Sequence, residues 1–302
     1  MFATMLKAEA AALLACMLAA APGAAAGSQH PSPAPATAPA AEAQPIQIGR
    51  SHRLASRILG EERVINVYLP DSYGQGERRY PVLYLIDGGV DQDFLHIAGT
   101  AQLGQIWGRS QEYIIVGVAT KDRRRELTGP TRDPELLARY PTAGHSEAFR
   151  RFIRDEVKPL VTAQYRTDGR TAVIGESLAG LFIVETLLRA PDLFDGYAAI
   201  SPSLWWDKER LSLEAARLVG RRRLDQRVYL ATAQEGPEME PPTDRLRAAL
   251  SAMPGLCYIP RTDLTHATIY HSVSPQALQY LFPPPTAPDP QMGFDIACSP
   301  RS

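Results

Sequence analysis

The residues with the clearest chemical potential are centred on Ser177, in the segment 175–180, which reads GESLAG. A short apolar run, 172–174, precedes this segment, and a largely apolar stretch, 181–189, follows it. A strand, a tight turn around a central serine and then a helix form the context of a nucleophile elbow, which projects the hydroxyl clear of a sheet. The start of the helix would favour negative charge that develops there. The segment therefore predicts a serine nucleophile that attacks a carbonyl carbon.

The elbow departs from the usual pattern Gly-x-Ser-x-Gly at its fifth position, which is Ala179. Alanine is the smallest replacement for glycine, so the elbow should persist if this residue avoids a positive φ. The plain alternative is a strand–helix turn that contains a serine by chance. The strand before Ser177, the helix after it and suitable partners further along the chain favour the catalytic interpretation.

A serine hydroxyl needs a base to remove its proton, and the base needs a third group to orient it. In folds with such an elbow, the chain order is serine, acid, histidine. The chain has six histidines, of which His266 and His271 follow Ser177. Because His266 comes just after the apolar run 256–259 and a short loop, we predict it as the base. His271 is expected to line the pocket or to cap the last helix.

The acid should follow the strand that is predicted over 228–231, because that strand should end at the same edge of the sheet. The first carboxylate after it is Glu235, which we favour. A solvated loop carboxylate is the plain alternative for this residue. The other candidates for the acid are Glu238, Glu240, Asp244 and Asp263.

Two N–H groups must face the oxyanion that forms during the attack. One should be the backbone N–H of Leu178, directly after the nucleophile. The other should come from the loop after the predicted strand 82–86, where Gly88 and Gly89 would let the backbone approach a substrate. The sequence does not choose between the two glycines, and such a pair is also typical of a simple turn.

Other residues are candidates for binding a substrate. Adjacent aromatic residues point in different directions, so we expect one of Trp205 and Trp206 to fill the core and the other to line the cleft. His145 is expected either at the pocket rim or at the entry of a helix that Ser146 caps. The arginine run 123–125 either binds an anionic group or lies in a solvated loop held by salt bridges.

The elements that must position these residues alternate along the chain between residues 46 and 283. Alternating strands and helices predict one α/β domain with a mainly parallel central sheet and helices on both faces. The apolar runs suited to strands are 64–69, 82–86, 113–119, 172–174, 197–200, 228–231 and 256–259. The helical patterns are 147–164, 181–189, 212–219, 244–253 and 275–281.

The two ends of the chain differ in composition from the predicted domain between them. Residues 1–26 have the layout of a cleaved export signal, with a cationic start, a short apolar core and an Ala-x-Ala site. Residues 27–45 are a Pro/Ala-rich linker and residues 284–302 a C-terminal tail on the surface. Export predicts a periplasmic or secreted protein; a lipoprotein processed at Cys16 is the less favoured alternative.

Removal of the signal would leave Cys257 and Cys298, which either form a disulfide in an oxidising compartment or stay as two thiols. The formal net charge is −1 and no basic block is present, so we expect no nucleic-acid partner. The apolar run of the signal is too short for an integral membrane span. The histidines are not at metal-ligand spacing, so no metal and no other cofactor is expected.

Several segments together resemble one known family. They are residues 80–88, 116–128 and 201–207, which read YPVLYLIDG, VGVATKDRRRELT and SPSLWWD, and the block 264–282, which contains His266. Over roughly residues 51–282, the chain is similar to the esterase family that includes enterochelin esterase and esterase D, within the α/β-hydrolases. It departs from the family's usual residues at Glu176, at Ala179 and at 119–121, where Lys121 would bring a charge near the pocket.

The resemblance implies an α/β-hydrolase fold and a serine esterase that acts through an acyl-enzyme. Its partner would be a small or medium ester, siderophore-like or of another acyl class. An acyltransferase with the same triad, or a non-catalytic binding protein on this scaffold, are the alternatives, because a fold alone does not specify an activity.

Overall fold

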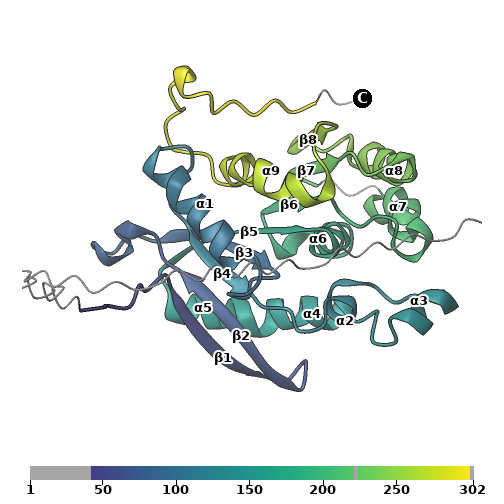
Figure 1. Cartoon of the computed structure of the whole chain (residues 1–302), viewed down its shortest axis with the longest axis horizontal. Coiled ribbons are helices and arrows are strands. Elements are labelled where there is room, and N and C mark those ends of the chain that lie inside the picture. The colour runs from purple at the N-terminus through teal and green to yellow at the C-terminus, as the bar shows by residue number, and fades with distance from the viewer. Residues whose placement is uncertain (1–41, 221–223, 300–302) are drawn as a thin grey trace, which may run out of the picture. The chain divides into compact units, whose positions relative to one another are not determined.

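An eight-stranded sheet lies at the centre of the fold (Figure 1). In chain order, its strands are β1 (Arg50–Ser56), β2 (Glu61–Tyr68), β3 (Tyr80–Ile86), β4 (Ile114–Val118), β5 (Thr167–Glu176), β6 (Gly196–Ile200), β7 (Arg227–Ala233) and β8 (Leu256–Arg261). They lie side by side in the order β1-β2-β4-β3-β5-β6-β7-β8. The strands from β3 to β8 are parallel, and β1 and β2 form an antiparallel hairpin at one edge. The mainly parallel sheet expected from the sequence is thus present.

The computed structural model describes residues 42–220 and 224–299. The predicted signal peptide, 1–26, and most of the predicted linker, 27–45, lie outside the described residues. The sheet and its helices belong to a compact unit of residues 47–302. The helices are α1 (Phe94–Ile106), α2 (Arg123–Leu127), α3 (Pro134–Arg139), α4 (Ser146–Phe152), α5 (Lys158–Gln164), α6 (Leu178–Arg189), α7 (Trp206–Val219), α8 (Glu240–Leu250) and α9 (His266–Leu281).

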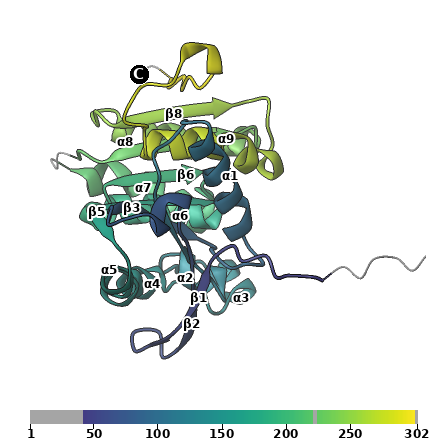
Figure 2. The ribbon, with the colours of Figure 1, turned by 90° about the vertical axis from the view of Figure 1, so that its left-hand side faces the viewer.

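Two apolar cores form because successive side chains of a strand point to opposite faces of the sheet. In β3, Val82 and Tyr84 pack with helices α4 to α8, whereas Leu83 and Leu85 pack with α1 and α9. Figure 2 shows α1 and α9 together on their side of the sheet. Burial on both faces explains why the inner strands read as unbroken apolar runs rather than alternating patterns.

Several elements differ from the expected ones. Strand β1 has mostly exposed side chains, so no apolar run marks it. Helix α9 begins at His266 rather than near Pro275, because a capping box between Thr265 and Thr268 starts the helix and Pro275 lies inside it. The helical pattern at 147–164 is confirmed as α4 and α5, which a π-helical segment, Ile153–Val157, connects.

The C-terminal tail is held to the domain by a covalent bond. Cys298 forms a disulfide with Cys257 of β8, so the disulfide is present and the two cysteines are not free thiols. The Ser299 N–H donates to the carbonyl oxygen of Tyr258 at 2.8 Å. Gln279 of α9 donates its side-chain N–H to the carbonyl oxygen of Phe294 at 2.6 Å. These contacts fix a segment that its proline-rich sequence alone would not order.

The double variant Cys257→Ser/Cys298→Ser should lower the free energy of unfolding by about 2–4 kcal/mol, because the bond closes a long loop of the unfolded chain. The bonded cysteines are 41 residues apart in sequence. Urea denaturation under oxidising conditions measures the difference. The control is the same comparison in reductant, where the two proteins should unfold at nearly equal urea concentrations. Equal stability under oxidising conditions would contradict the prediction.

Candidate active site

Ser177 lies at a sharp turn between the end of β5 and the start of α6. Its φ is 62° and its ψ is −120°, a conformation that non-glycine residues rarely adopt. The Ser177 N–H donates to the carbonyl oxygen of Ile200 in the neighbouring strand at 3.0 Å, which holds the turn in place. Such strain persists only where surrounding contacts impose it, and it is typical of functional sites.

The alanine at the fifth position of the elbow fits because Ala179 lies inside α6, not among the residues with positive φ. A Cβ on Gly175 would lie 2.6 Å from the Cβ of Ala179, and a Cβ on Gly180 would lie 2.9 Å from the carbonyl oxygen of Ile200. The close approach of helix and strand therefore requires glycine at 175 and 180. At position 179, the packing of helix and strand leaves room for the alanine side chain, as the sequence indicated.

Two further residues at the same edge of the sheet share this backbone strain. Asp87 follows β3 with a φ of 58°, and Ser201 follows β6 with a φ of 42°. The three strained turns thus come directly after adjacent parallel strands, at their carboxyl ends. In open parallel sheets, this edge is where ligands bind.

A pocket of about 330 Å³ opens at this edge and brings the predicted triad together. Ser177, His266 and Glu235 all line it, and Leu178 lies beside them. They come from three separate parts of the fold: the elbow, the first residue of α9 and the loop after β7. The structure thus places in one cavity the three residues that chain order and strand ends indicated.

His266 is hydrogen-bonded through Nδ1 to Oε1 of Glu235. This contact raises the pKa of His266, because a carboxylate that accepts the bond favours the protonated ring. The use of Nδ1 leaves Nε2 available for another partner. Among the five candidate acids, Glu235 is the one that the described structure joins to His266. Asp263 instead pairs with Arg261 at 2.6 Å.

A second carboxyl group near His266 is Glu176, whose Oε1 is buried and has no hydrogen-bond partner within the described part of the chain. Burial raises the pKa of Glu176 to about 7, and the nearby Asp93 and Glu235 add to this effect while His266 opposes it. In turn, the charge of Glu176 favours the protonated form of His266. His266 therefore lies among several carboxyl groups, of which Glu176 was noted in the sequence only as a departure from the family.

The hydroxyl of Ser177 lies 3.3 Å from the hydroxyl of Ser203, which is buried. The Ser203 N–H also donates to the carbonyl oxygen of Ser177 at 3.1 Å. No hydrogen bond joins Ser177 to His266 in the described structure, although both line the pocket. The segment 201–207 was one of those that resembled the family, but no pattern in it indicated that Ser203 would contact Ser177.

The two glycines expected to supply an oxyanion donor are both engaged. The Gly88 N–H donates to the carbonyl oxygen of Val118 at 3.0 Å, and the Gly89 N–H donates to the side-chain oxygen of Gln92 at 2.9 Å. A Cβ on Gly88 would lie 2.2 Å from the Cα of Gly117. Glycine is therefore required at position 88 by the crossing with β4, and of the two candidate donors Gly88 is the one whose N–H already bonds to a strand carbonyl. The N–H of Gly89 is held only by a side chain.

Of the adjacent tryptophans, Trp205 lines the pocket and is 44% exposed, whereas Trp206 is 4% exposed and packs in the core. The expected division of the pair is confirmed, and Trp206 does not line the pocket of Ser177. His145 is the N-cap residue of α4, where its N–H donates to the carbonyl oxygen of Arg125 at 2.8 Å. It is a helix-entry residue and does not line the pocket.

His271 also lies away from the pocket, because α9 begins earlier than the sequence indicated. Five residues of helix rotate a side chain by about 140° after a full turn, so His271 and His266 point in different directions. The Nδ1 of His271 lies 3.2 Å from Nε2 of His96 on α1. The expectation that His271 lines the pocket is therefore wrong.

The arginine run 123–125 lies in α2, and two of its side chains line the pocket. Arg123 and Arg124 line the pocket, and the Nε of Arg123 donates to the Asp87 carboxylate at 2.9 Å. Both residues start α2, which Asp122 caps by accepting from the N–H groups of Arg124 and Arg125, each at 3.1 Å. Arg123 and Arg124 thus line the cavity of Ser177; the ion pair of Arg123 with Asp87 fits a loop held by salt bridges, and binding of an anionic group stays a prediction.

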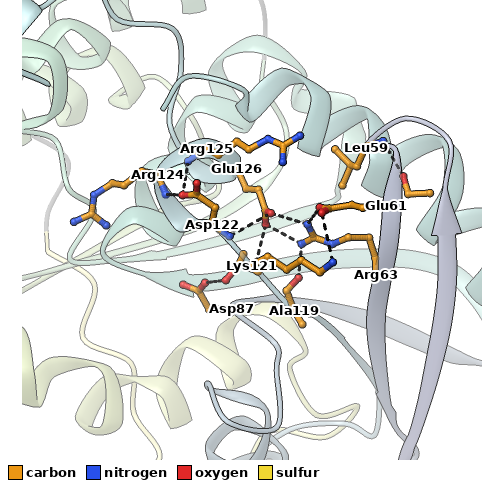
Figure 3. A network of polar contacts seen from close by, with 12 residues as sticks. Leu59, Glu61, Arg63, Asp87, Ala119, Lys121, Asp122, Arg124, Arg125 and Glu126 are labelled. Carbon is orange, nitrogen blue, oxygen red and sulfur yellow. Dashed lines mark hydrogen bonds and ion pairs between the residues drawn. The ribbon is translucent and has the colours of Figure 1, made fainter. Parts of the chain in front are cut away.

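A buried ion pair fixes α2 to the sheet (Figure 3). Arg63 of β2 donates through Nη1 and Nη2 to the two carboxylate oxygens of Glu126, at 2.6 and 2.8 Å. The Arg63 side chain is 1% exposed and that of Glu126 3%. Arg63 also donates to the carbonyl oxygen of Ala119 at 2.6 Å. The pair therefore ties the hairpin, β4 and the helix that carries the pocket arginines into one unit.

Across residues 42–220 and 224–299, no group of three His, Cys, Asp or Glu side chains is arranged to hold a metal ion. None of the helices in those ranges has both the length and the apolar character to cross a membrane.

Glu235→Gln should lower the pKa of His266, because the amide no longer offers the charge that favours the protonated ring. NMR titration of the histidine ring protons measures this change. Glu238→Gln is the matched control: Glu238 lines the same pocket but makes no bond to His266, so the pKa should stay near that of the parent protein. Equal effects of the two substitutions would contradict the assigned contact.

Arg63→Met should lower the free energy of unfolding by about 3–5 kcal/mol, because it leaves the buried Glu126 carboxylate without its partner. The double variant Arg63→Met/Glu126→Met should recover part of this loss. Arg53 is the matched control, because its pair with Glu62 has side chains 78% and 54% exposed. Arg53→Met should change stability by less than about 0.5 kcal/mol. Thermal and urea denaturation measure the stability of all three variants. Similar losses of unfolding free energy in Arg53→Met and Arg63→Met would contradict the prediction.

Known proteins resemble this chain in sequence over part of their length. Ferri-bacillibactin esterase BesA of Bacillus subtilis (strain 168) is 35% identical over 149 residues, which cover 43% of this chain and 50% of that protein. A siderophore triacetylfusarinine C esterase of Aspergillus fumigatus is 29% identical over 206 residues, which cover 61% of this chain and 66% of that protein. The chain thus spans from half to just under two thirds of these relatives.

Solved structures extend the similarity to the fold. An IroE-like serine hydrolase from Shewanella oneidensis superposes with a TM-score of 0.68 at 27% identity, covering 78% of this chain and 80% of that one. The BES protein from Bacillus cereus has a TM-score of 0.69 at 22% identity, over 80% and 99% of the two chains, and shows the same fold. Together with the mainly parallel sheet, these likenesses establish an α/β-hydrolase fold. Since residues 56–253 match the family described as "Putative esterase", well over half of the 302 residues, the chain belongs to that esterase family.

Proposed function

We propose that this chain hydrolyses a carboxylic ester through an acyl-enzyme on Ser177. The observation that carries the proposal is the shared pocket: a strained serine at a strand end, with a histidine whose Nδ1 is already bonded to a carboxylate. This arrangement of nucleophile, base and orienting acid is the one that activates a serine hydroxyl.

The first half of the reaction forms the acyl-enzyme. The hydroxyl of Ser177 turns from Ser203 towards Nε2 of His266, which takes its proton as the oxygen attacks the ester carbonyl. Such catalytic hydrogen bonds often tighten only when a substrate is bound. Glu235 stabilises the imidazolium that results. The imidazolium then gives its proton to the departing alcohol, and the acyl group stays on Ser177.

The oxyanion needs donors that carry no competing bond. Leu178 opens α6, so no preceding helical carbonyl accepts its backbone N–H, which can face the oxyanion. Of the two glycines, Gly89 is the second donor we propose, because rotation of the Gln92 side chain would free its N–H. Two such donors typically contribute a factor of roughly 10²–10³ each to the rate.

The second half returns the free enzyme. His266, now neutral, takes a proton from a water molecule as that water attacks the acyl carbon. The same donors hold the second oxyanion, and His266 returns the proton to Ser177 as the acid product leaves. An alcohol in place of water would give acyl transfer instead, so competition between the two acceptors distinguishes the activities.

We infer a siderophore-like ester as the substrate class. The relatives that the chain resembles are named as esterases of ferri-bacillibactin and triacetylfusarinine C. The pocket offers Arg123 and Arg124 for anionic oxygens and the exposed face of Trp205 for an apolar or aromatic group. We also propose export to the periplasm or the medium by the signal at 1–26, which the disulfide supports, since such bonds persist in oxidising compartments.

Ser177→Ala and His266→Ala should each reduce kcat for p-nitrophenyl acetate and butyrate by roughly 10³-fold or more, because either change removes the activated nucleophile. His271→Ala is the matched control and should keep nearly full activity, because His271 points away from the pocket. Hydrolysis of triacetylfusarinine C, followed by chromatography, tests the substrate class with the same proteins.

Glu235→Ala should lose much more activity than Glu238→Ala, because only the former releases the base from its partner. Equal losses of activity in the two variants would contradict the assignment of Glu235 as the acid. Full activity of Ser177→Ala would overturn the proposed mechanism, and loss confined to His271→Ala would move the base to that residue.

A further inference from the structure

One acidic side chain lies on the apolar side of the sheet that packs against α1 and α9. Glu176 is the last residue of β5, and in the register with β6 it lies opposite Ile200. Ile200 and Ile174 both pack in the core with α1 and α9. Gly175, between them in β5, faces the other way, because a Cβ there would lie 2.6 Å from the Cβ of Ala179 in α6. Since side chains alternate along a strand, Glu176 points to the same side as Ile174.

The surrounding protein does not satisfy the carboxyl group of Glu176. Its Oε1 is buried and accepts no hydrogen bond from residues 42–220 and 224–299. A buried polar atom without a partner lowers stability, and the cost is larger when the group is charged. Native proteins retain few such groups, and a role in catalysis is one of the reasons for keeping them.

Charged and titratable groups from several elements face Glu176. Arg123 pairs with Asp87, and His266 is bonded to Glu235. Glu176 itself forms no ion pair in the described ranges, so its charge acts on these neighbours only through space. The groups with which it interacts are His266 and Tyr270 from α9, Asp93 before α1, Arg123 from α2 and Glu235 after β7.

We propose that Glu176 is a positioning residue of the esterase reaction: a second carboxylate that, together with Glu235, stabilises the imidazolium form of His266. The inference rests on the proposed function. Glu235 acts through its bond to Nδ1, whereas Glu176 acts through its charge between the end of β5 and the start of α9. Glu176 is not among the residues that line the pocket of Ser177, so it acts on the base rather than on a substrate.

The charge of Glu176 changes within the pH range in which a histidine base works. Burial raises the pKa of Glu176 to about 7. The negative charges of Asp93 and Glu235 add to this effect, and the positive charges of His266 and Arg123 oppose it. Once ionised, Glu176 raises the pKa of His266 in turn. The two groups therefore titrate as a coupled pair.

The effect on catalysis has opposite signs in the free enzyme and in the transition state. In the free enzyme, the charge of Glu176 keeps His266 protonated, and thus inactive as a base, to a higher pH. In the transition state, the same charge stabilises the imidazolium that forms as Ser177 loses its proton. Glu176→Gln should therefore shift the acidic limb of kcat/KM to lower pH and reduce kcat on the plateau by roughly three- to tenfold.

Hydrolysis of p-nitrophenyl acetate from about pH 5.5 to 9.5 measures both effects. KM should stay near the parent value, because Glu176 lies outside the pocket. Glu240→Gln is the matched control, since Glu240 is exposed at the start of α8 and does not line the pocket of Ser177. Its pH profile should superpose on that of the parent. Circular dichroism checks that each variant is folded.

Two kinetic outcomes contradict the inference. One is a folded Glu176→Gln variant with the profile and kcat of the parent. The other is an equal loss of activity at every pH with the acidic limb unmoved, which is what a purely structural role would give. Glu176→Asp keeps the carboxylate and should retain the acidic limb near that of the parent, so a limb that shifts as far as in Glu176→Gln also counts against it.

His266 can also be followed without reference to activity. In a Ser177→Ala background, NMR titration of its ring protons should give a lower pKa in Glu176→Gln and an unchanged one in Glu240→Gln. An unchanged titration in Glu176→Gln, with Ser177→Ala inactive, would refute this inference and leave the proposed esterase mechanism intact. Full activity of Ser177→Ala together with a lowered pKa of His266 would refute the mechanism while confirming the charge effect.

Discussion

The bond between Arg63 and Glu126 joins parts of the molecule that would otherwise be independent. Arg63 lies in the antiparallel hairpin at one edge of the sheet, and Glu126 in the short helix that starts with the pocket arginines. A helix of five residues is too short to be stable alone, so its position depends on such contacts. Removing two charges from water is costly, and the pair repays this only because both groups are further hydrogen-bonded. The pair thereby fixes the positions of Arg123 and Arg124 relative to the sheet.

A second constraint is the backbone strain at the carboxyl ends of the strands. There the chain turns sharply three times, after β3, β5 and β6, and each time a residue other than glycine takes a positive φ. Each of these turns is tied to a neighbouring strand: the N–H groups of Gly88, Ser177 and Ser201 donate to carbonyls of Val118, Ile200 and Ala231. Hydrogen bonds to neighbouring strands thus maintain a strained backbone conformation that an isolated turn would not keep. Ser177 and its surroundings are thus held in fixed positions, and the proposed mechanism requires preorganisation of this kind.

The core of the site could be predicted from sequence because its signals are local or ordered along the chain. Ser177 has a strand before it and a helix after it, while His266 and Glu235 each follow a recognisable strand. Contacts between distant segments gave no such signal. The N–H of Gly88 is taken by a strand 30 residues later, and the direction of His271 depends on where α9 begins. Strand β1 and helix α1 were missed for a related reason: the first has too few buried residues, and the second has apolar residues on all sides.

The tail that Cys298 fixes to β8 has a consequence for the edge of the sheet. β8 is the last strand in the sheet order, so one side of it has no neighbouring strand, and such an edge invites pairing with other chains. The Ser299 N–H donates to the carbonyl oxygen of Tyr258 and so occupies one backbone group of β8, next to the disulfide between Cys298 and Cys257. By holding the tail beside β8, the disulfide keeps this edge group occupied. Loss of this disulfide would release the tail and leave that backbone group of β8 open to pairing with another chain.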